Sequence, residues 1–97
     1  MKYTVKYFQT ARTDRSIIKS YLSQFSSTAY TRLFEKIKDK IEITKNNPYI
    51  YPSYEHRPQF RRIVVDDYLV FYKVNEESKT IEVYRILHGM MDIEQIL

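Results

Sequence analysis

The fold is decided by residues 60–74, which read FRRIVVDDYLVFYKV. Two short runs of β-branched and aromatic residues flank the pair Asp66-Asp67, the pattern of two strands joined by a tight turn. The second run, residues 68–74, is apolar on both of its alternating faces, so we expect it to be covered on both sides at the centre of a sheet. A polar turn over 75–79 and another apolar run over 80–88 complete a three-stranded antiparallel meander.

The chain before this meander predicts one strand and two helices. Residues 2–8 alternate polar and apolar, the period of a half-buried strand. From 10 to 46, apolar residues recur at spacings of three and four, as on one face of a helix, and the pattern is interrupted at 26–28. The expected buried positions are Ile17, Ile18, Tyr21, Leu22 and Phe25 in the first helix and Tyr30, Leu33, Phe34, Ile37 and Ile41 in the second. Two helices joined so tightly run antiparallel and form a hairpin.

The remaining segments connect and close this unit. Residues 47–59 contain all three prolines between tyrosines, which predicts an ordered, extended loop without regular structure. Residues 92–97 are compatible with one closing helical turn. The predicted fold is α+β: a strand, a two-helix hairpin, a three-stranded antiparallel meander and a short C-terminal turn, in a single domain over residues 1–97.

Composition excludes several classes of protein. The apolar fraction of 43%, with ten tyrosines and five phenylalanines, is that of a globular protein rather than a disordered one. Without cysteine there is neither a disulfide framework nor a thiolate metal site, and the two histidines lack partners at ligand spacing. We therefore expect no metal and no cofactor. No apolar run suggests a signal peptide or a membrane span, so the expected location is cytoplasmic.

Charge is distributed unevenly along the chain. Residues 1–45 hold ten Lys and Arg against four Asp and Glu, whereas residues 46–97 hold six against eight. Three basic residues of the first helix, Arg12, Arg15 and Lys19, share one face. This pattern indicates a polyanionic partner, either nucleic acid or an acidic peptide, although a solvated helix surface would give the same pattern.

Several segments in a fixed order resemble a known family. They are the opening strand with Tyr3 and Val5, the helix with Ile17-Ile18 and Tyr21-Leu22, and the helix end at Asn46-Asn47-Pro48. Tyr51-Pro52, Arg61-Arg62, the strand 68–74 and the segment from Ile81 through Arg85-Ile86-Leu87-His88-Gly89 to Asp92 follow. Their conjunction within 97 residues resembles the RelE/ParE superfamily of plasmid-stabilisation toxins, with the order β-α-α-β-β-β.

This resemblance implies a cytoplasmic toxin of a type II toxin–antitoxin system, neutralised by a cognate antitoxin, in a hetero-oligomer of undetermined stoichiometry. ParE-like members inhibit DNA gyrase, whereas RelE-like members cut mRNA on the ribosome. Leu69 stands where RelE-like nucleases carry an arginine, Met90-Met91 replaces basic residues, and the chain lacks a terminal aromatic residue. These departures favour gyrase inhibition. The alternative is a metal-independent, ribosome-dependent mRNA endoribonuclease.

Candidate site residues follow from the chemistry that each function needs. RNA cleavage requires proton transfer and cations that stabilise the phosphate, and the candidates for catalysis are Arg62, Arg85 and His88. The candidates for binding the target are Arg61, Arg62, Arg85 and His88. The candidates for binding the antitoxin are Arg12, Arg15, Lys19, Met90 and Met91, because an acidic amphipathic segment would suit basic and adaptable apolar side chains.

Ordinary structural roles compete with these assignments. Arg61 and Arg62 also fit the role of solubilising charges at a strand edge, and His88 that of a hydrogen-bonded residue at a strand end. Arg85 lies in an apolar strand, so its burial would require a paired carboxylate. Strict alternation places Arg85 and His88 on opposite faces of their strand. Glu55, His56 and Arg57 form a second titratable cluster, in the loop.

Overall fold

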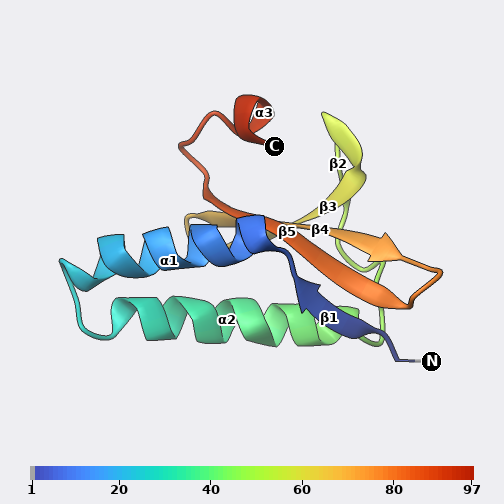
Figure 1. The fold of residues 1–97 in the computed structure, drawn as a ribbon, viewed down its shortest axis with the longest axis horizontal. Helices are drawn as coiled ribbons and strands as arrows, with labels where there is room; N and C mark the ends of the chain where they lie inside the picture. Colours follow the sequence, from blue (N-terminus) through green and yellow to red (C-terminus); the bar gives the residue numbers. More distant parts are fainter. Residues whose placement is uncertain (1) are drawn as a thin grey trace.

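The computed structural model describes residues 2–97 and has the predicted elements in the predicted order, with one further strand, β2 (Figure 1). The elements are β1 (Thr4–Tyr7), α1 (Gln9–Ser23), α2 (Ala29–Thr44), β2 (Ser53–Tyr54), β3 (Arg57–Val65), β4 (Tyr68–Asn75), β5 (Thr80–His88) and α3 (Ile93–Ile96). The helices α1 and α2 lie side by side on one face of the sheet, and α3 lies on the other side (Figure 1). The α+β prediction is confirmed.

The sheet has five strands in the order β1-β5-β4-β3-β2. The strands β3, β4 and β5 form the predicted antiparallel meander, and β1 joins its edge parallel to β5. The connection over 47–59 was expected to be a loop without regular structure, but it contains β2, which pairs antiparallel with β3. As a result β3 begins at Arg57, three residues earlier than the apolar pattern indicates. The pairing partner, which sequence periodicity does not reveal, extends the strand.

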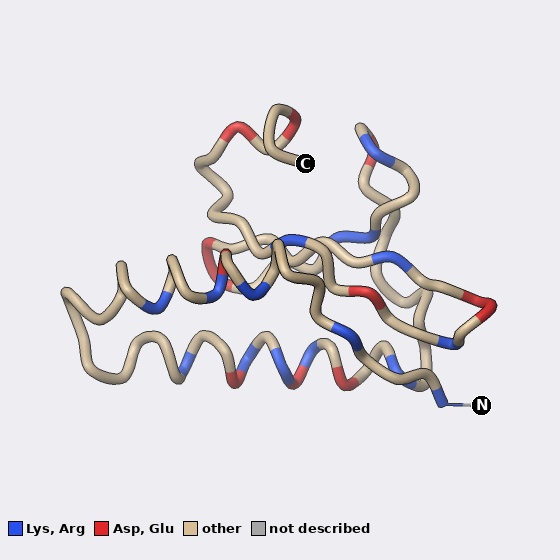
Figure 2. The backbone as a smooth tube through the Cα atoms, in the orientation of Figure 1, with Lys and Arg blue, Asp and Glu red and all other residues tan. Residues whose placement is uncertain are grey.

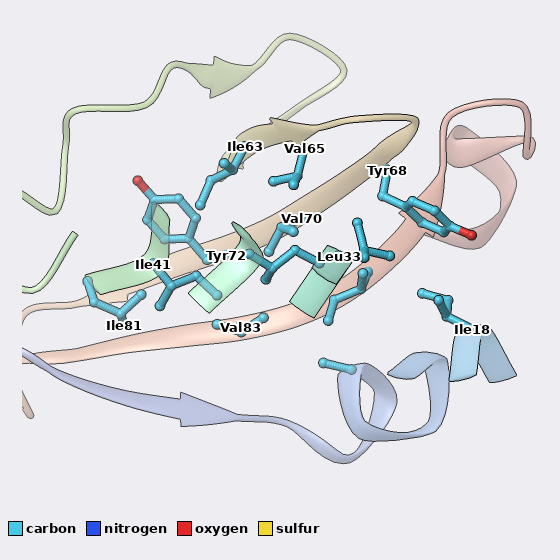
Figure 3. Packing of buried hydrophobic residues seen from close by; sticks show 13 residues of the cluster. Ile18, Leu33, Ile41, Ile63, Val65, Tyr68, Val70, Tyr72, Ile81 and Val83 are labelled. Carbon is cyan, nitrogen blue, oxygen red and sulfur yellow. The ribbon is translucent and has the colours of Figure 1, made fainter. Parts of the chain in front are cut away.

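The main core lies between the helix hairpin and the sheet (Figure 3). Side chains of α2 expected to be buried, Leu33, Ile37 and Ile41, pack against β-strand residues such as Val70 and Tyr72. The opposite face of the sheet carries a smaller cluster around Tyr54, Phe60, Phe71 and Leu87, against which Ile93, Ile96 and Leu97 pack. Val70 and Phe71 are both completely buried, so the prediction that β4 is covered on both faces is confirmed.

The prediction for α1 is wrong in one respect. Ile18 is buried and Leu22 partly buried, but Ile17, Tyr21 and Phe25 are 63%, 55% and 70% exposed. The helix instead turns Ala11 and Asp14 towards the core. The pairing of Asp14 with a strand residue, described below, is compatible only with this rotation, and it leaves an apolar stripe of α1 uncovered.

A polar cluster joins three distant segments at the other end of the sheet. Glu76, in the turn between β4 and β5, accepts hydrogen bonds from the hydroxyl of Tyr3 at 2.6 Å, the ammonium of Lys79 at 2.8 Å and the hydroxyl of Tyr49. These bonds, with that of Lys79 as the largest contribution, lower the pKa of Glu76 from 4.5 to about 2. The cluster connects the segment before β1, the connection after α2 and the β4–β5 turn.

Candidate functional site

A bulge lies in the middle of β5, at Tyr84, directly before Arg85. Phe71 pairs with Arg85 whereas the next residue of β4, Tyr72, pairs with Val83, so β5 contributes an extra residue at this point. From Arg85 to His88 the residues pair consecutively with Phe71 to Tyr68, so the expected alternation holds between the two. Both side chains nevertheless line the same hollow, because Arg85 turns towards α1.

Arg85 is held by a carboxylate of α1. Its Nε and Nη2 each lie 2.8 Å from a different oxygen of Asp14, and the backbone N–H of Ile86 donates to Asp14 Oδ2 at 2.9 Å. The side chain of Asp14 is 7% exposed and that of Arg85 21%. Hydrogen bonding to Asp14 raises the pKa of Arg85. The sequence predicted that Arg85 would need a paired carboxylate, which is confirmed, but it did not identify Asp14.

The signal for Asp14 was present in the sequence. Asp14 lies three residues after Ala11 and four before Ile18, so it occupies a position within the buried stripe of the helix. An aspartate in such a stripe needs a cation or several donors, because an unpaired buried carboxylate is strongly destabilising. The apolar residues alone predict a buried stripe centred on Ile17 and Tyr21, and Asp14 lies outside that stripe.

The hollow beside this pair has an apolar wall and a polar floor. It has a volume of about 420 Å³, and Asp14, Arg85 and His88 are its polar residues. Its apolar lining residues are Ile17, Ile18, Tyr21, Tyr68, Ile86, Leu87, Met90 and Met91. Figure 3 shows Tyr68 at the end of the core beside Ile18. Met90 is 87% exposed, and the exposed stripe of α1 forms the facing wall. The hollow is therefore an open apolar surface over a fixed ion pair.

The two arginines of β3 lie on opposite sides of the sheet. Arg61 pairs with Tyr72 and Arg62 with Phe71, whose side chains belong to different clusters. Arg61 donates from Nη1 to the carbonyl of Tyr51 at 2.7 Å, whereas the guanidinium of Arg62 lies over the ring of Tyr54, 5.7 Å from its centre. Arg62 thus faces away from the helices, on the side opposite the Asp14–Arg85 pair.

The loop cluster expected around His56 contacts the C-terminal helix. His56 Nδ1 lies 2.8 Å from Glu94 Oε1 of α3, and both side chains are about half exposed. The ring of His56 also packs edge-on against Tyr54. Glu55 and Arg57 are exposed beside it. This contact joins the β2–β3 turn to α3 across the face of the sheet that is turned away from α1 and α2, here called the open face.

The basic residues of α1 lie on the side away from the hollow. Arg15 donates from Nε to the hydroxyl of Tyr30 at 2.7 Å, and the ammonium of Lys19 lies over the same ring, 5.4 Å from its centre. Arg12 lines a separate hollow with Phe8 and Tyr84. Figure 2 shows basic positions along α1 and mixed basic and acidic positions along α2. The five antitoxin-binding candidates therefore lie on two surfaces. Arg12, Arg15 and Lys19 lie on the basic side of α1, whereas Met90 and Met91 line the hollow.

Sequence reasoning overlooked Lys73 and its aromatic neighbours. The ammonium of Lys73 lies over the rings of Phe60 and Tyr84, 5.0 Å and 5.6 Å from their centres, on the same open face as Arg62. Leu69 packs against the apolar cluster of this face. Within residues 2–97 no three His, Cys, Asp or Glu side chains gather as a metal site would need, and no helix there is both long and apolar enough to cross a membrane.

Solved structures share this fold at low sequence identity. The ParDE system from P. aeruginosa matches with a TM-score of 0.72 at 14% identity, covering 90% of this chain and 96% of that one. The isolated E. coli RelE toxin matches with a TM-score of 0.67 at 17% identity, covering 98% and 99%. The toxin–antitoxin complex RelBE2 from Mycobacterium tuberculosis matches with a TM-score of 0.63 at 17% identity, covering 91% and 99%.

Sequence comparison identifies the family. No curated protein matches the chain significantly. The family described as the ParE toxin of the type II toxin-antitoxin system parDE, however, matches over residues 5–93, nearly the whole chain. The chain therefore belongs to the ParE toxin family and is the toxin component of a type II toxin–antitoxin system.

Proposed function

We propose that this toxin arrests growth by binding and inhibiting DNA gyrase, in the manner implied by the ParE-like branch. It then acts in the cytoplasm as a binding protein without a catalytic step. The observation that carries the proposal is the separation of the three candidate catalytic residues. Arg62 faces the open side of the sheet, whereas Arg85 and His88 line the hollow on the helix side.

Cleavage of RNA would need those groups to converge. A general acid or base must come within hydrogen-bond reach of the reacting oxygen, and a stabilising cation must contact the same phosphate. Arg85 directs its Nε and Nη2 to Asp14, which already accepts them at 2.8 Å. A bound target protein imposes no such requirement, because separate contacts can contribute to one interface.

Two parallel assays test this proposal. The purified toxin should inhibit supercoiling by gyrase at concentrations that leave mRNA on translating ribosomes uncut. A gyrase assay in which the toxin has no effect, together with ribosome-dependent cuts, would reject it. The double variant R61A/R62A removes two target-binding candidates and should inhibit gyrase less, and its circular dichroism spectrum must match that of the parent because Arg61 contacts Tyr51 and Arg62 lies over Tyr54.

The neutralising partner is proposed to be a cognate antitoxin that contacts the basic side of α1. Three of the similar structures are described as toxin–antitoxin complexes or systems, from M. tuberculosis, P. aeruginosa and E. coli. Arg12, Arg15 and Lys19 would attract an acidic segment. Reversing the three charges to Glu should weaken the complex about tenfold or more at low salt and reduce its salt dependence. Unchanged affinity in calorimetry would mean that this side of α1 is only a solvated surface.

One observation favours the alternative, a ribosome-dependent nuclease. The open face combines Arg62 and Lys73 with the rings of Tyr54, Phe60 and Tyr84, and such groups bind RNA phosphates and stack on bases. The nearest imidazole on that side belongs to His56, whose ring packs against Tyr54. If the alternative holds, His56→Ala should reduce cleavage roughly 10²–10⁴-fold, the usual contribution of proton transfer.

A further inference from the structure

The floor of the hollow beside α1 offers hydrogen-bond donors that have no acceptor. Arg85 uses Nε and Nη2 for Asp14, and its Nη1 has no partner within residues 2–97. His88 Nδ1 accepts the backbone N–H of Met90 at 3.1 Å, so the proton of the neutral ring lies on Nε2, which has no partner among the same residues. Within residues 2–97 every buried side-chain nitrogen or oxygen atom has a hydrogen-bond partner. Arg85 Nη1 and His88 Nε2 have none, so they are not buried and a ligand can reach them.

The charge of the floor is already balanced. Asp14 neutralises Arg85 through two hydrogen bonds, and its two oxygens accept three donors in total. A ligand carboxylate would lie close to Asp14 and lose its own hydration, and like charges nearby oppose its attraction to Arg85. An uncharged oxygen satisfies the same donors at a smaller desolvation cost. The floor therefore suits a carbonyl or amide oxygen better than a carboxylate.

The walls of the hollow require apolar groups. Ile17 and Tyr21 face it from α1 and Met90 and Met91 from the segment after β5, and all four are exposed. Methionine side chains adapt their shape to different apolar partners. A volume of about 420 Å³ accommodates a few apolar side chains of an entering segment rather than a whole helix.

We propose that this hollow binds an apolar segment of a partner protein and that an uncharged oxygen of the segment, from a main-chain carbonyl or a side-chain amide, accepts from Arg85 Nη1 and His88 Nε2. The site differs from the basic side of α1, to which an acidic segment is assigned above. It is also independent of the choice between gyrase and the ribosome. Binding here is accordingly insensitive to salt.

The test uses the full chain, labelled for NMR on its methionine methyl groups. The probes are blocked tripeptides built on acetyl-Leu-Ala-Leu-amide, with Phe or Met in the outer positions, and the same peptides with a free C-terminal carboxylate. The blocked peptides should shift the Met90 and Met91 signals saturably, with the same affinity at low and physiological salt. Tighter binding of the carboxylate forms by tenfold, or the absence of shifts with every peptide, would overturn the proposal.

Variants locate the binding and separate it from other occupants. Tyr21→Ser should weaken the blocked peptides about tenfold, whereas Ile43→Ser on α2, which removes a similarly exposed apolar side chain outside the hollow, should change nothing. His88→Phe keeps the apolar wall and removes one donor, so affinity should fall about fivefold. Equal effects of Tyr21→Ser and Ile43→Ser contradict the site. Concentration-dependent shifts without peptide that Tyr21→Ser abolishes would identify a second copy of this chain as the occupant instead.

Discussion

The two faces of the sheet differ in what covers them and in what their charged groups do. The face under α1 and α2 is closed by a continuous apolar layer, and the cation at its edge, Arg85, is paired with Asp14. The other face has a smaller apolar cluster under α3, and its cations Arg62 and Lys73 lie over aromatic rings and form no ion pair within residues 2–97. The first arrangement fixes the structure, whereas the second leaves charges available to a partner.

This difference shows why neighbouring cations of one meander need not share a role. Arg62 and Arg85 both pair with Phe71 in the sheet register, yet they point to opposite sides. Buried ion pairs are rigid because each charge depends on the other, whereas an exposed cation over a ring can exchange its contacts. Substitutions that act on one face at a time test whether the two faces differ in this way.

The largest expected effect comes from the centre of the sheet. Phe71 is completely buried on the open face, so that face contributes to stability despite its sparse cover. Phe71→Ala should lower the free energy of unfolding by roughly 3–5 kcal/mol, a large share of the stability of so small a domain. Urea denaturation measures this. Val64→Ala, at an exposed position of β3, is the control and should cost no more than about 0.5 kcal/mol. A similar small loss for Phe71→Ala would mean that only the helix side stabilises the fold.

The Asp14–Arg85 pair gives the next largest effect. Asp14→Ala leaves Arg85 and the Ile86 N–H without their acceptor, which should cost roughly 3 kcal/mol. Asp39→Ala, on the exposed side of α2, should be close to neutral. Denaturation of both variants under the same conditions compares them. Equal stability of the two would show that the pair does not anchor α1 to β5.

Inhibition of the target should depend more on the cations of the open face than on His88. In a gyrase-binding toxin, well-folded Arg62→Ala should weaken inhibition several-fold, because an exposed cation on a rigid strand contacts its target with little ordering cost. Arg85→Ala would weaken it too, but through loss of the Asp14 pair, so circular dichroism must accompany growth arrest as the readout. His88→Ala should do little. Full toxicity of all three folded variants would move the target site to Glu55–Arg57 or to Met90-Met91.

The sequence predicted the elements of this fold well because local periodicity and topology determine them. The meander, the helix hairpin and the double cover of β4 follow from patterns within a few residues of each other. The edge strand β2 pairs with a nearby segment, but it is only two residues long and follows Pro52, so it carries no periodic pattern and was missed. The β1–β5 pairing likewise leaves no trace in either strand's own pattern.

The candidate site was less predictable because single-residue geometry decides it. Arg85 is held by Asp14 of α1, so it lines the same hollow as His88 although the two residues alternate along β5. A rotation of α1 exposed Ile17 and Tyr21 and buried Asp14, although both stripes have helical spacing. Arg61, Arg62 and Arg85 stay candidates, and their assignment to faces required the register of the sheet.

The smallest expected effect lies outside both faces, at Glu76. Its pKa of about 2 in the folded protein is below the ordinary value of 4.5, because Lys79, Tyr3 and Tyr49 donate to its charged form. The stability that this carboxylate contributes is therefore complete above about pH 4.5 and is lost as the pH falls towards 2. Glu76→Gln should flatten the fall in melting temperature over that range, while Glu77→Gln, its exposed neighbour, should leave it unchanged. Because Glu76 is exposed, the difference should be small. Toxicity at neutral pH should not change in either variant, and a loss confined to Glu76→Gln would show that the β4–β5 turn belongs to the target-binding surface.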